Sequence, residues 1–487
     1  MLKITRENII LLSSVILVIV GLVFNHSMLA AIICLLLAIG TLSNKSLGIM
    51  FLLMYIPVRP FLITVNPGFK VIGDAIVFAL LVRTVFDYRK NVKQLFVFNK
   101  FEIAFLLFCV IGSISALLTD VSLTAIIFQL RAYLLFYILF YVLKRMDYSE
   151  FNIKKYALLT FLLAVVLSLQ GFVEKISDKT LLMPEEWTNW WLSPTNHVRV
   201  YGLLKGPNEL SLYLMIAIFI SIYLISLVSV KNRKYIYIGI SLIFTTILLT
   251  YSRGALLCAI GFGIIYLVLY RETLKKIIVP AIIIGAASTM LFFSINWGAD
   301  IYYSNVIENE QNYADEETGD TESESSNKGS NRYKDAFSKT TLEQSMSAGR
   351  IYYVQKGVEI FKDYPIIGSG FATFGGAATL SYSSPIYEDY NIDRDFYSDN
   401  QYILVLVETG IVGTLALFAT FIFLALFVWK RKTGYYFSPL LMFLFISTLI
   451  GGSVYNILEN DSFMMFFYMI LGLAAHFAKN NEISSKL

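Results

Sequence analysis

Apolar residues are grouped along this chain in blocks that are each close to the length of a membrane-spanning helix. A helix needs about 20 apolar residues to cross the hydrocarbon core of a bilayer, and short polar stretches separate the blocks. Predicted spans lie near residues 8–24, 27–42, 48–65, 71–87, 101–118, 122–143, 156–174, 208–229, 235–250, 254–270, 276–295, 403–429, 436–454 and 461–478. The pattern predicts an all-α, polytopic membrane protein with about 12–14 transmembrane helices.

Basic residues in the short loops indicate the orientation of these spans. Lysine and arginine are enriched in the cytoplasmic loops of membrane proteins. They fall here on every second loop, as Lys3/Arg6, Lys45, Arg89/Lys90/Lys93/Lys100, Lys144/Arg145/Lys154/Lys155, Lys231/Arg233/Lys234, Arg271/Lys275/Lys276 and Lys430/Arg431/Lys432. The alternation predicts that both termini are cytoplasmic and that the long segment 296–402 is extracytoplasmic.

The chain is organised in three parts. Residues 1–295 are predicted to form an N-terminal bundle of about 11 helices, residues 296–402 a large extracytoplasmic loop, and residues 403–487 the C-terminal transmembrane helices. Within the loop, residues 305–335 are acidic and rich in Ser, Asn and Gly, which predicts a disordered insertion. Residues 350–362 carry apolar side chains at helical spacing and predict an amphipathic helix.

The composition agrees with a membrane location and argues against several functional classes. Hydrophobic residues make up 57% of the 487 positions and charged residues 15%, unlike the balance found in soluble domains. The formal net charge of +4 is spread over many loops, so a nucleic-acid partner is not expected. The three cysteines lie in apolar blocks and the three histidines are scattered, so we expect neither a metal nor another cofactor.

Arg131 is a candidate functional residue because of its position inside a predicted span. It lies in the apolar run from Ile126 to Leu143, where burial of a guanidinium costs at least about 2.5 kcal/mol unless it is paired or hydrated. A functional role would explain that cost. The alternatives are that its guanidinium extends to the membrane interface or pairs with a residue such as Asp74.

Two further arginines lie at predicted outer ends of spans. Arg253 follows Tyr251 and Ser252 in the link between two spans, where a membrane anchor is the alternative to a ligand-binding role. Arg199 lies shortly before Gly206-Pro207-Asn208, a sequence suited to a turn or to the first turn of a helix. A plain helix start is therefore the alternative to binding by Arg199 and Asn208.

Arg350 and Asp399 bracket the part of the long loop that is predicted to be ordered. Arg350 begins the predicted amphipathic helix, and Asp399-Asn400-Gln401-Tyr402 comes directly before a span that contains Glu408. Each could be an ordinary solvent-exposed residue.

Arginines and a carboxylate from different segments are thus predicted on one side of the membrane. The arginine fork matches the oxygens of a diphosphate, and in a partly water-excluded site it stabilises the charge that develops on a departing diphosphate. A nearby carboxylate can take the proton of an attacking hydroxyl. This combination suits group transfer from a diphosphate-linked donor.

Short motifs carry a resemblance to a known family. They are Arg199-x-x-Gly202 with Pro207-Asn208, Ser252-Arg253-Gly254-Ala255, Gly349-Arg350 followed by Pro365-x-x-Gly368-x-Gly370, and Asp399-Asn400-x-Tyr402 with Glu408-x-Gly410-x-x-Gly413. In their order, and with the long outward loop, the chain resembles the superfamily of O-antigen polymerases and O-antigen ligases. These are bacterial membrane glycosyltransferases.

The resemblance implies a GT-C-like, all-helical membrane glycosyltransferase that acts on a glycan carried by undecaprenyl diphosphate, without a metal or a nucleotide sugar. It implies catalytic roles for Arg253, Arg350 and Asp399. Substrate-binding roles are implied for Arg131, Arg199, Asn208, Asn400 and Tyr402.

Asp399 departs from the pattern of the family. Ligases of the superfamily typically have a histidine just before the Asn-x-Tyr segment, where this chain has Asp399. An aspartate, with a reference pKa of about 3.9, is a weaker base than histidine unless burial raises its pKa. The difference favours a polymerase and leaves the identity of the base open.

These observations predict a polysaccharide polymerase that joins lipid-linked repeat units at the outer face of the bacterial cytoplasmic membrane. The product would be a capsule, a teichuronic-acid-like polymer, an O-antigen or an exopolysaccharide. The expected partners are the undecaprenyl-diphosphate-linked glycan, membrane lipids, a flippase and a chain-length regulator. The alternatives are a ligase that moves a finished glycan to an acceptor, and a glycolipid transporter, although the chain lacks the clear internal repeat of many transporters.

Overall fold

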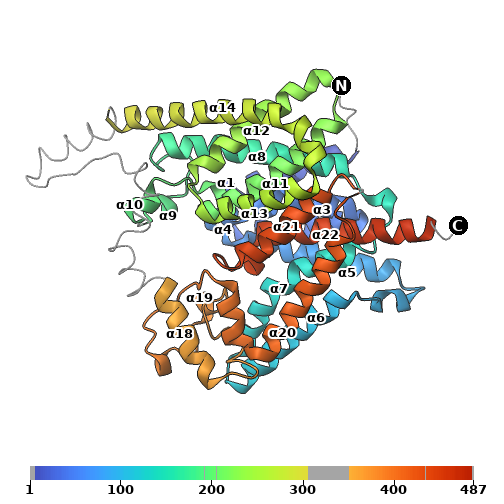
Figure 1. Cartoon of the computed structure of the whole chain (residues 1–487), viewed down its shortest axis with the longest axis vertical. Coiled ribbons are helices and arrows are strands. Elements are labelled where there is room, and N and C mark those ends of the chain that lie inside the picture. Colours follow the sequence, from blue (N-terminus) through green and yellow to red (C-terminus); the bar gives the residue numbers. More distant parts are fainter. Residues whose placement is uncertain (1–5, 191, 205, 305–349, 434, 485–487) are drawn as a thin grey trace, which may run out of the picture. The chain divides into compact units, whose positions relative to one another are not determined.

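The structure is a computed structural model that describes residues 6–190, 192–204, 206–304, 350–433 and 435–484. The regular elements in these ranges are all helices (Figure 1). The predicted insertion at 305–335 lies outside the described residues.

The helices confirm a polytopic, all-α membrane protein. Eight segments are long and apolar enough to cross a membrane: α1 (Arg6–Phe24), the stretch of α3, η1 and α4 (Lys45–Val65), α6 (Lys100–Leu118), α7 (Leu123–Leu143), α8 (Ile153–Ile176), α11 (Pro207–Leu227), residues Ile277–Tyr302 of α14, and α20 (Gln401–Trp429). Shorter apolar helices are α2 (Ser27–Ser43), α13 (Arg253–Leu269), α21 (Ser438–Gly451) and the Asp461–Phe477 part of α22.

The remaining helices complete the chain order. They are α5 (Ile72–Asp87), α12 (Val230–Leu249), α9 (Glu185–Thr188), α10 (Pro194–His197), α18 (Arg350–Asp363) and α19 (Thr379–Tyr382), with α14 running over Arg271–Tyr302 and α22 over Asp461–Ser484. Short 3-10 turns are η2 (Pro67–Val71), η3 (Val92–Phe96), η4 (Tyr148–Glu150), η5 (Gly202–Leu204), η7 (Glu388–Tyr390) and η8 (Ile457–Glu459).

Two compact units interleave along the sequence. Among the described residues, unit 1 comprises 6–79, 149–253 and 270–304, and unit 2 comprises 80–148, 254–269 and 350–484. Each unit has its own set of packed helices.

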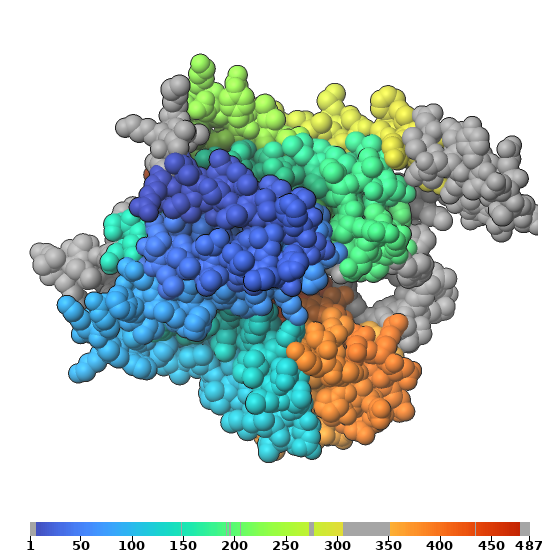
Figure 2. All heavy atoms as spheres, turned by 180° about the vertical axis from the view of Figure 1, so that it is seen from behind, coloured from blue at the N-terminus to red at the C-terminus, as the bar shows by residue number. Residues whose placement is uncertain are grey.

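In unit 1, α8, α11, α12 and α14 pack side by side (Figure 1). Small residues allow this close approach, as is usual between membrane helices. A Cβ added at Gly239 of α12 would lie 2.4 Å from the ring of Phe161 on α8. The first helices, α1 to α3, pack against one another in the same unit, and they are the dark-blue surface in Figure 2.

In unit 2, α6 packs along α20 and α7 packs along α22. The helix α20 is broken near its start, because Gly410 has φ +59° and ψ −162°. A break in a helix leaves backbone N–H and C=O groups without their usual partners, and these groups are costly to bury unpaired.

The loop after α18 pairs with the groups freed by this break. The N–H groups of Ser369 and Gly370 donate to the carbonyls of Val407 (2.9 Å) and Glu408 (2.8 Å). In the opposite direction, the N–H groups of Ile411 and Val412 donate to the carbonyls of Pro365 (2.9 Å) and Ile366 (3.0 Å). The segment Pro365-x-x-Gly368-x-Gly370 therefore completes the broken helix.

The same loop is bound to α6 on its other side. The N–H of Phe371 donates to the carbonyl of Gly112 (3.0 Å), and the hydroxyl of Thr119 donates to the carbonyl of Ser369 (2.6 Å). The ring of Phe371 fills the space beside Gly112, where an added Cβ would lie 2.4 Å from it. The loop thus lies between α6 and α20 and is bonded to both.

Residues 350–400 have an aromatic core of their own. α18 covers the stretch for which the sequence predicts an amphipathic helix and packs on α20. The ring of Tyr353 stacks on Phe396 with centroids 3.8 Å apart, and Phe374 and Tyr387 contact the same Phe396 ring. The segment is the compact orange body in Figure 2.

Two glycines of this loop should be irreplaceable. Gly368 has φ +77°, and a Cβ there would lie 2.3 Å from the backbone nitrogen of Thr409. Gly370 has φ +100°, with a Cβ 2.2 Å from Ala116. We expect Gly368→Ala and Gly370→Ala each to lower the free energy of unfolding by at least about 1–3 kcal/mol, measured as a fall in the thermal midpoint of the purified protein.

The matched control is Gly263→Ala in α13, where an added Cβ meets no atom within 4 Å. Alanine favours a helix interior over glycine by roughly 0.5–1 kcal/mol, so this variant should match or exceed the wild-type stability. Equal thermal midpoints for the Gly368 and Gly263 variants would contradict the described role of the loop.

Candidate functional site

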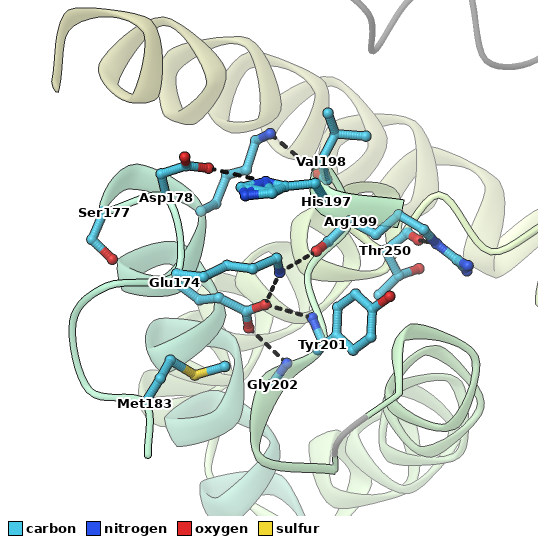
Figure 3. A network of polar contacts seen from close by, with 12 residues as sticks. Glu174, Ser177, Asp178, Met183, His197, Val198, Arg199, Tyr201, Gly202 and Thr250 are labelled. Atoms are coloured by element: carbon cyan, nitrogen blue, oxygen red, sulfur yellow. Dashed lines mark hydrogen bonds and ion pairs between the residues drawn. The ribbon is translucent and has the colours of Figure 1, made fainter. Parts of the chain in front are cut away.

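The carboxylate of Glu174 organises the first polar cluster, in unit 1 (Figure 3). Glu174 lies in the last turn of α8 and is fully buried. Its Oε1 accepts from the N–H of Tyr201 (2.8 Å), and its Oε2 accepts from the N–H of Gly202 (2.7 Å). A buried charge is tolerated only when it is paired and hydrogen-bonded. The ammonium of Lys179 supplies the pairing charge at Oε1.

Lys179 connects this carboxylate to the backbone of the next segment. Its Nζ also donates to the carbonyl of Arg199 (2.6 Å) and lies 4.5 Å from the ring centroid of Tyr201. Gly202 adopts φ +61°, a conformation that glycine adopts without steric cost. The chain from Arg199 to Gly202 is therefore held in one conformation by α8 and the turn that follows it.

The side chain of Arg199 joins three segments. Its Nε donates to the carbonyl of Thr250 (2.8 Å), and one terminal nitrogen donates to Oδ1 of Asn208 (2.7 Å). The hydroxyl of Ser252 donates to the same Asn208 oxygen (3.0 Å). Arg199 is 8% exposed, and both Nε and a terminal nitrogen of its guanidinium are bonded to the protein.

Arg253 follows directly on the turn that this cluster fixes. Tyr251 has φ +49°, and the N–H of Val200 donates to the carbonyl of Leu249 (3.1 Å), so both sides of the turn are bonded to the Arg199 segment. Arg253 is exposed, and its guanidinium makes no hydrogen bond or ion pair with any residue in the described ranges. The turn is rigid, and the guanidinium that it carries has its donors available.

The structure thus brings together three residues that the sequence singled out separately. Arg199 and Asn208 bond to each other, and both contact the segment that ends at Arg253. The predicted helix start is also present, since α11 begins at Pro207. The side chains of Arg199 and Asn208 are bonded within the protein, whereas the side chain of Arg253 is exposed.

The second polar cluster, in unit 2, is centred on the carboxylate of Glu459. Glu459 ends η8, between α21 and α22. Its Oε1 accepts from Nε2 of Gln129 (2.6 Å) and lies 3.5 Å from the hydroxyl of Tyr133. Its Oε2 accepts from the N–H of Ala377 (2.9 Å) and from the hydroxyl of Tyr397 (2.9 Å). Burial is the main cause that raises the pKa of Glu459 above the usual range of a carboxyl group.

Gln129 and Glu459 together hold the backbone of the loop before α19. Gln129 is fully buried in α7, and its Oε1 accepts from the N–H of Ala378 (3.2 Å). Gly376 permits this approach, because a Cβ there would lie 3.0 Å from Oε1 of Gln129 and 3.2 Å from Oε1 of Glu459. α7, η8 and the loop meet at this carboxylate.

Asp399, Asn400 and Tyr402 lie at the start of α20 in the same unit. Asn400 is the N-cap, and its Oδ1 accepts from the N–H groups of Tyr402 and Ile403, both at 3.1 Å. Such a cap satisfies two of the free donors at a helix start. Asp399 adopts φ +51° and is half-buried, and the ring of Tyr402 is 39% exposed.

Arg131 and Arg350 complete the predicted set. Arg131 is partly buried in α7. Residues two positions apart on a helix point about 200° away from each other, so Arg131 does not share the face on which Gln129 and Tyr133 contact Glu459. Arg350 is the first residue of α18, and its side chain lies outside the described residues.

The tryptophans upstream of Arg199 have different environments. Trp187 is buried with its ring 6.4 Å from that of Phe61, whereas Trp190 is 44% exposed and contacts Tyr201. Trp191 lies outside the described residues.

Four residues that organise these clusters were missed in the sequence: Gln129, Glu174, Lys179 and Glu459. Two of them carried a signal. Gln129 and Glu174 are polar residues inside apolar blocks, where an unpaired polar group is costly. Within the described ranges, no group of three or more His, Cys, Asp or Glu side chains could hold a metal ion.

Comparison with known families finds a match for one part of the chain. Residues 238–418 match the family model described as O-antigen ligase. The match includes Arg253, Arg350, Asp399 and the loop that pairs with α20, whereas Arg131, Arg199 and Asn208 lie before it. No curated protein matches the chain.

Glu174→Gln tests the first cluster. The substitution leaves the ammonium of Lys179 buried without its charged partner, which costs roughly 3–5 kcal/mol for a buried pair. We expect a clear fall in the thermal midpoint of the purified variant. The double variant Glu174→Gln with Lys179→Met should recover part of the loss, because it removes the unpaired charge.

The control is Glu359→Gln, which removes the exposed pair of Lys356 with Glu359, a residue whose side chain is 53% exposed. Such surface pairs contribute about 0–1 kcal/mol. A Glu174 variant as stable as this control would show that the buried pair does not hold the cluster.

Proposed function

We propose that this protein is a polysaccharide polymerase of the O-antigen polymerase and ligase superfamily, and the match of residues 238–418 to the family model described as O-antigen ligase supports the proposal. It joins undecaprenyl-diphosphate-linked repeat units at the outer face of the bacterial cytoplasmic membrane. Members of this family are glycosyltransferase-like enzymes, and the many apolar helices agree with a substrate that is anchored in a bilayer.

The availability of Arg253 on a rigid turn is the observation that carries this proposal. Arg199, Asn208 and Ser252 fix the turn through bonds of 2.7–3.0 Å. The guanidinium of Arg253 is a planar fork of donors that can bind two oxygens of a diphosphate at once. The bonded turn fixes the backbone position from which this guanidinium extends.

The proposed reaction is a direct displacement without a metal. A hydroxyl of one repeat unit attacks the anomeric carbon of the other glycan, the bond from that carbon to the diphosphate oxygen breaks, and undecaprenyl diphosphate leaves. Arg253 stabilises the negative charge that develops on the leaving group. The attacking hydroxyl gives its proton to a carboxylate.

The choice of polymerase over ligase rests on Asp399, which occupies the place where ligases of the superfamily typically have histidine. The alternative is a ligase that moves a finished glycan from undecaprenyl diphosphate to an acceptor, and the description of the matched family favours it. A glycolipid transporter is a second alternative. A flippase and a chain-length regulator are the proposed partners of the polymerase.

Arg253→Ala should reduce polymer formation by at least about 10²–10³-fold, the range found when one charge-stabilising donor is removed. Arg253→Lys should lie between this variant and the wild type, because lysine keeps the charge but lacks the fork. The measurement is the polymer formed by membranes with matched amounts of each protein. Arg89→Ala, an exposed arginine on the predicted cytoplasmic side, is the control and should be unchanged.

A deletion strain separates the polymerase from the ligase. Loss of a polymerase should cause single lipid-linked repeat units to accumulate, as seen by mass spectrometry of extracted lipids. Accumulation of long lipid-linked polymer would instead identify a ligase. Polymer synthesis by the purified protein from extracted lipid-linked units would exclude the transporter.

A further inference from the structure

Glu459 presents a carboxylate that is fixed on one side and accessible on the other. Gln129 is fully buried and Tyr133 is 2% exposed, so the contacts with Oε1 lie inside the unit. The partners of Oε2 are the backbone of Ala377 and the hydroxyl of Tyr397, a residue that is 36% exposed, and Glu459 itself is partly exposed. The Tyr397 hydroxyl therefore marks the accessible side of the carboxylate.

A phenol hydroxyl and a sugar hydroxyl make the same kind of hydrogen bond to a carboxylate oxygen. Tyr397 is held on an irregular segment before α20, and its ring is partly exposed. A sugar hydroxyl that takes the place of the Tyr397 hydroxyl would lie about 2.6–3.2 Å from Oε2, the distance that proton transfer requires.

Asp399 lies two residues after Tyr397, in the turn that leads into α20. Its backbone adopts φ +51°, which aspartate tolerates in turns, and it joins Ser398 to the N-cap residue Asn400. Ser398 is itself bonded through Asn456 to the carbonyl of Gly375. The turn at Asp399 is thus part of how α20 begins.

We propose that Glu459 is the catalytic base that receives the proton of the acceptor hydroxyl, and that Asp399 positions the start of α20. This inference rests on the proposed function. As the acceptor oxygen forms its bond to the anomeric carbon, its proton moves to Oε2 of Glu459. The bond between that carbon and the diphosphate breaks, and its electron pair leaves with undecaprenyl diphosphate. The protonated Glu459 then returns the proton to water.

The environment of Glu459 suits this role. Burial raises its pKa towards the pH at which the reaction runs, which makes it a better base than an ordinary carboxylate. The titratable groups that face it are Tyr133 of α7, Tyr397 of the loop and Glu408 of α20. Asp461, at the start of α22, is the next charged residue along the chain.

The direction of the pH dependence follows from these groups. A base acts in its deprotonated form, so polymer formation should fall as the pH falls through the pKa of Glu459. The hydroxyl of Tyr397 stabilises the charged form and lowers this pKa. Removal of that hydroxyl in Tyr397→Phe should raise the pKa and move the acidic limb of the profile to higher pH.

The test uses the full-length protein in vesicles, with lipid-linked repeat units extracted from the deletion strain. Glu459→Gln should lose at least about 100-fold in rate, as expected for a base, while the thermal midpoint shows that it is folded. Asp399→Asn should retain more than a tenth of the rate with an unchanged acidic limb. Glu388→Gln, an exposed carboxyl group in the same loop region, is the control and should match the wild type.

Each outcome decides the question. A Glu459→Gln variant with the wild-type rate and pH profile overturns the proposal, as does an Asp399→Asn variant that alone loses activity. If Glu459→Gln does not fold, the Tyr397→Phe profile decides, since an unmoved acidic limb also overturns it. Failure of the wild-type protein to form polymer would instead contradict the proposed function.

Discussion

The backbone groups released by the break in α20 are the constraint on which unit 2 depends. A break at membrane depth leaves N–H and C=O groups that cannot bond to water, and each such group costs several kcal/mol if it stays unpaired. The loop 365–371 supplies the missing partners through four bonds of 2.8–3.0 Å. Irregular backbone is tolerated inside a membrane protein when it is enclosed in this way.

The pairing of the loop with the broken helix also determines where the buried polar side chains of this unit lie. Beyond the loop, the chain forms the turn at Gly375 and Gly376, whose backbone meets Asn456, Gln129 and Glu459. Oε1 of Glu408 accepts from the N–H groups of Thr373 and Phe374 (3.3 Å each), which holds the intervening segment against α20. The carboxylate at Glu459 is therefore fixed by the same backbone that closes the helix.

Hydrophobic periodicity was sufficient to predict the helical class and the helix after Arg350, because apolar length and spacing follow directly from the bilayer and the helix. The predicted span boundaries also placed Arg199 and Arg253 near the ends of spans. Hydrophobic periodicity could not show that Arg199 is bonded to Asn208 and Thr250, since those bonds depend on the path of residues 199–202 around Glu174.

The motif Pro365-x-x-Gly368-x-Gly370 shows a different limit of prediction from sequence. Its residues supported a resemblance to an enzyme family, yet in the structure they act through the backbone, at φ values of +77° and +100° and in contact with α6 and α20. A short motif does not reveal whether it supports chemistry or packing. Glu459 illustrates the converse, because a single acid in a short loop has no pattern around it, and its hydrogen-bond partners Gln129 and Tyr397 are distant in sequence.

The attachment of the 365–371 loop to both α6 and α20 restricts the motions that unit 2 can make. A flap that opens and closes needs a hinge with few bonds, and this loop is bonded to two spans by its backbone. The 365–371 loop is therefore a fixed part of unit 2. Any motion that separates α6 from α20 would have to break these backbone bonds first.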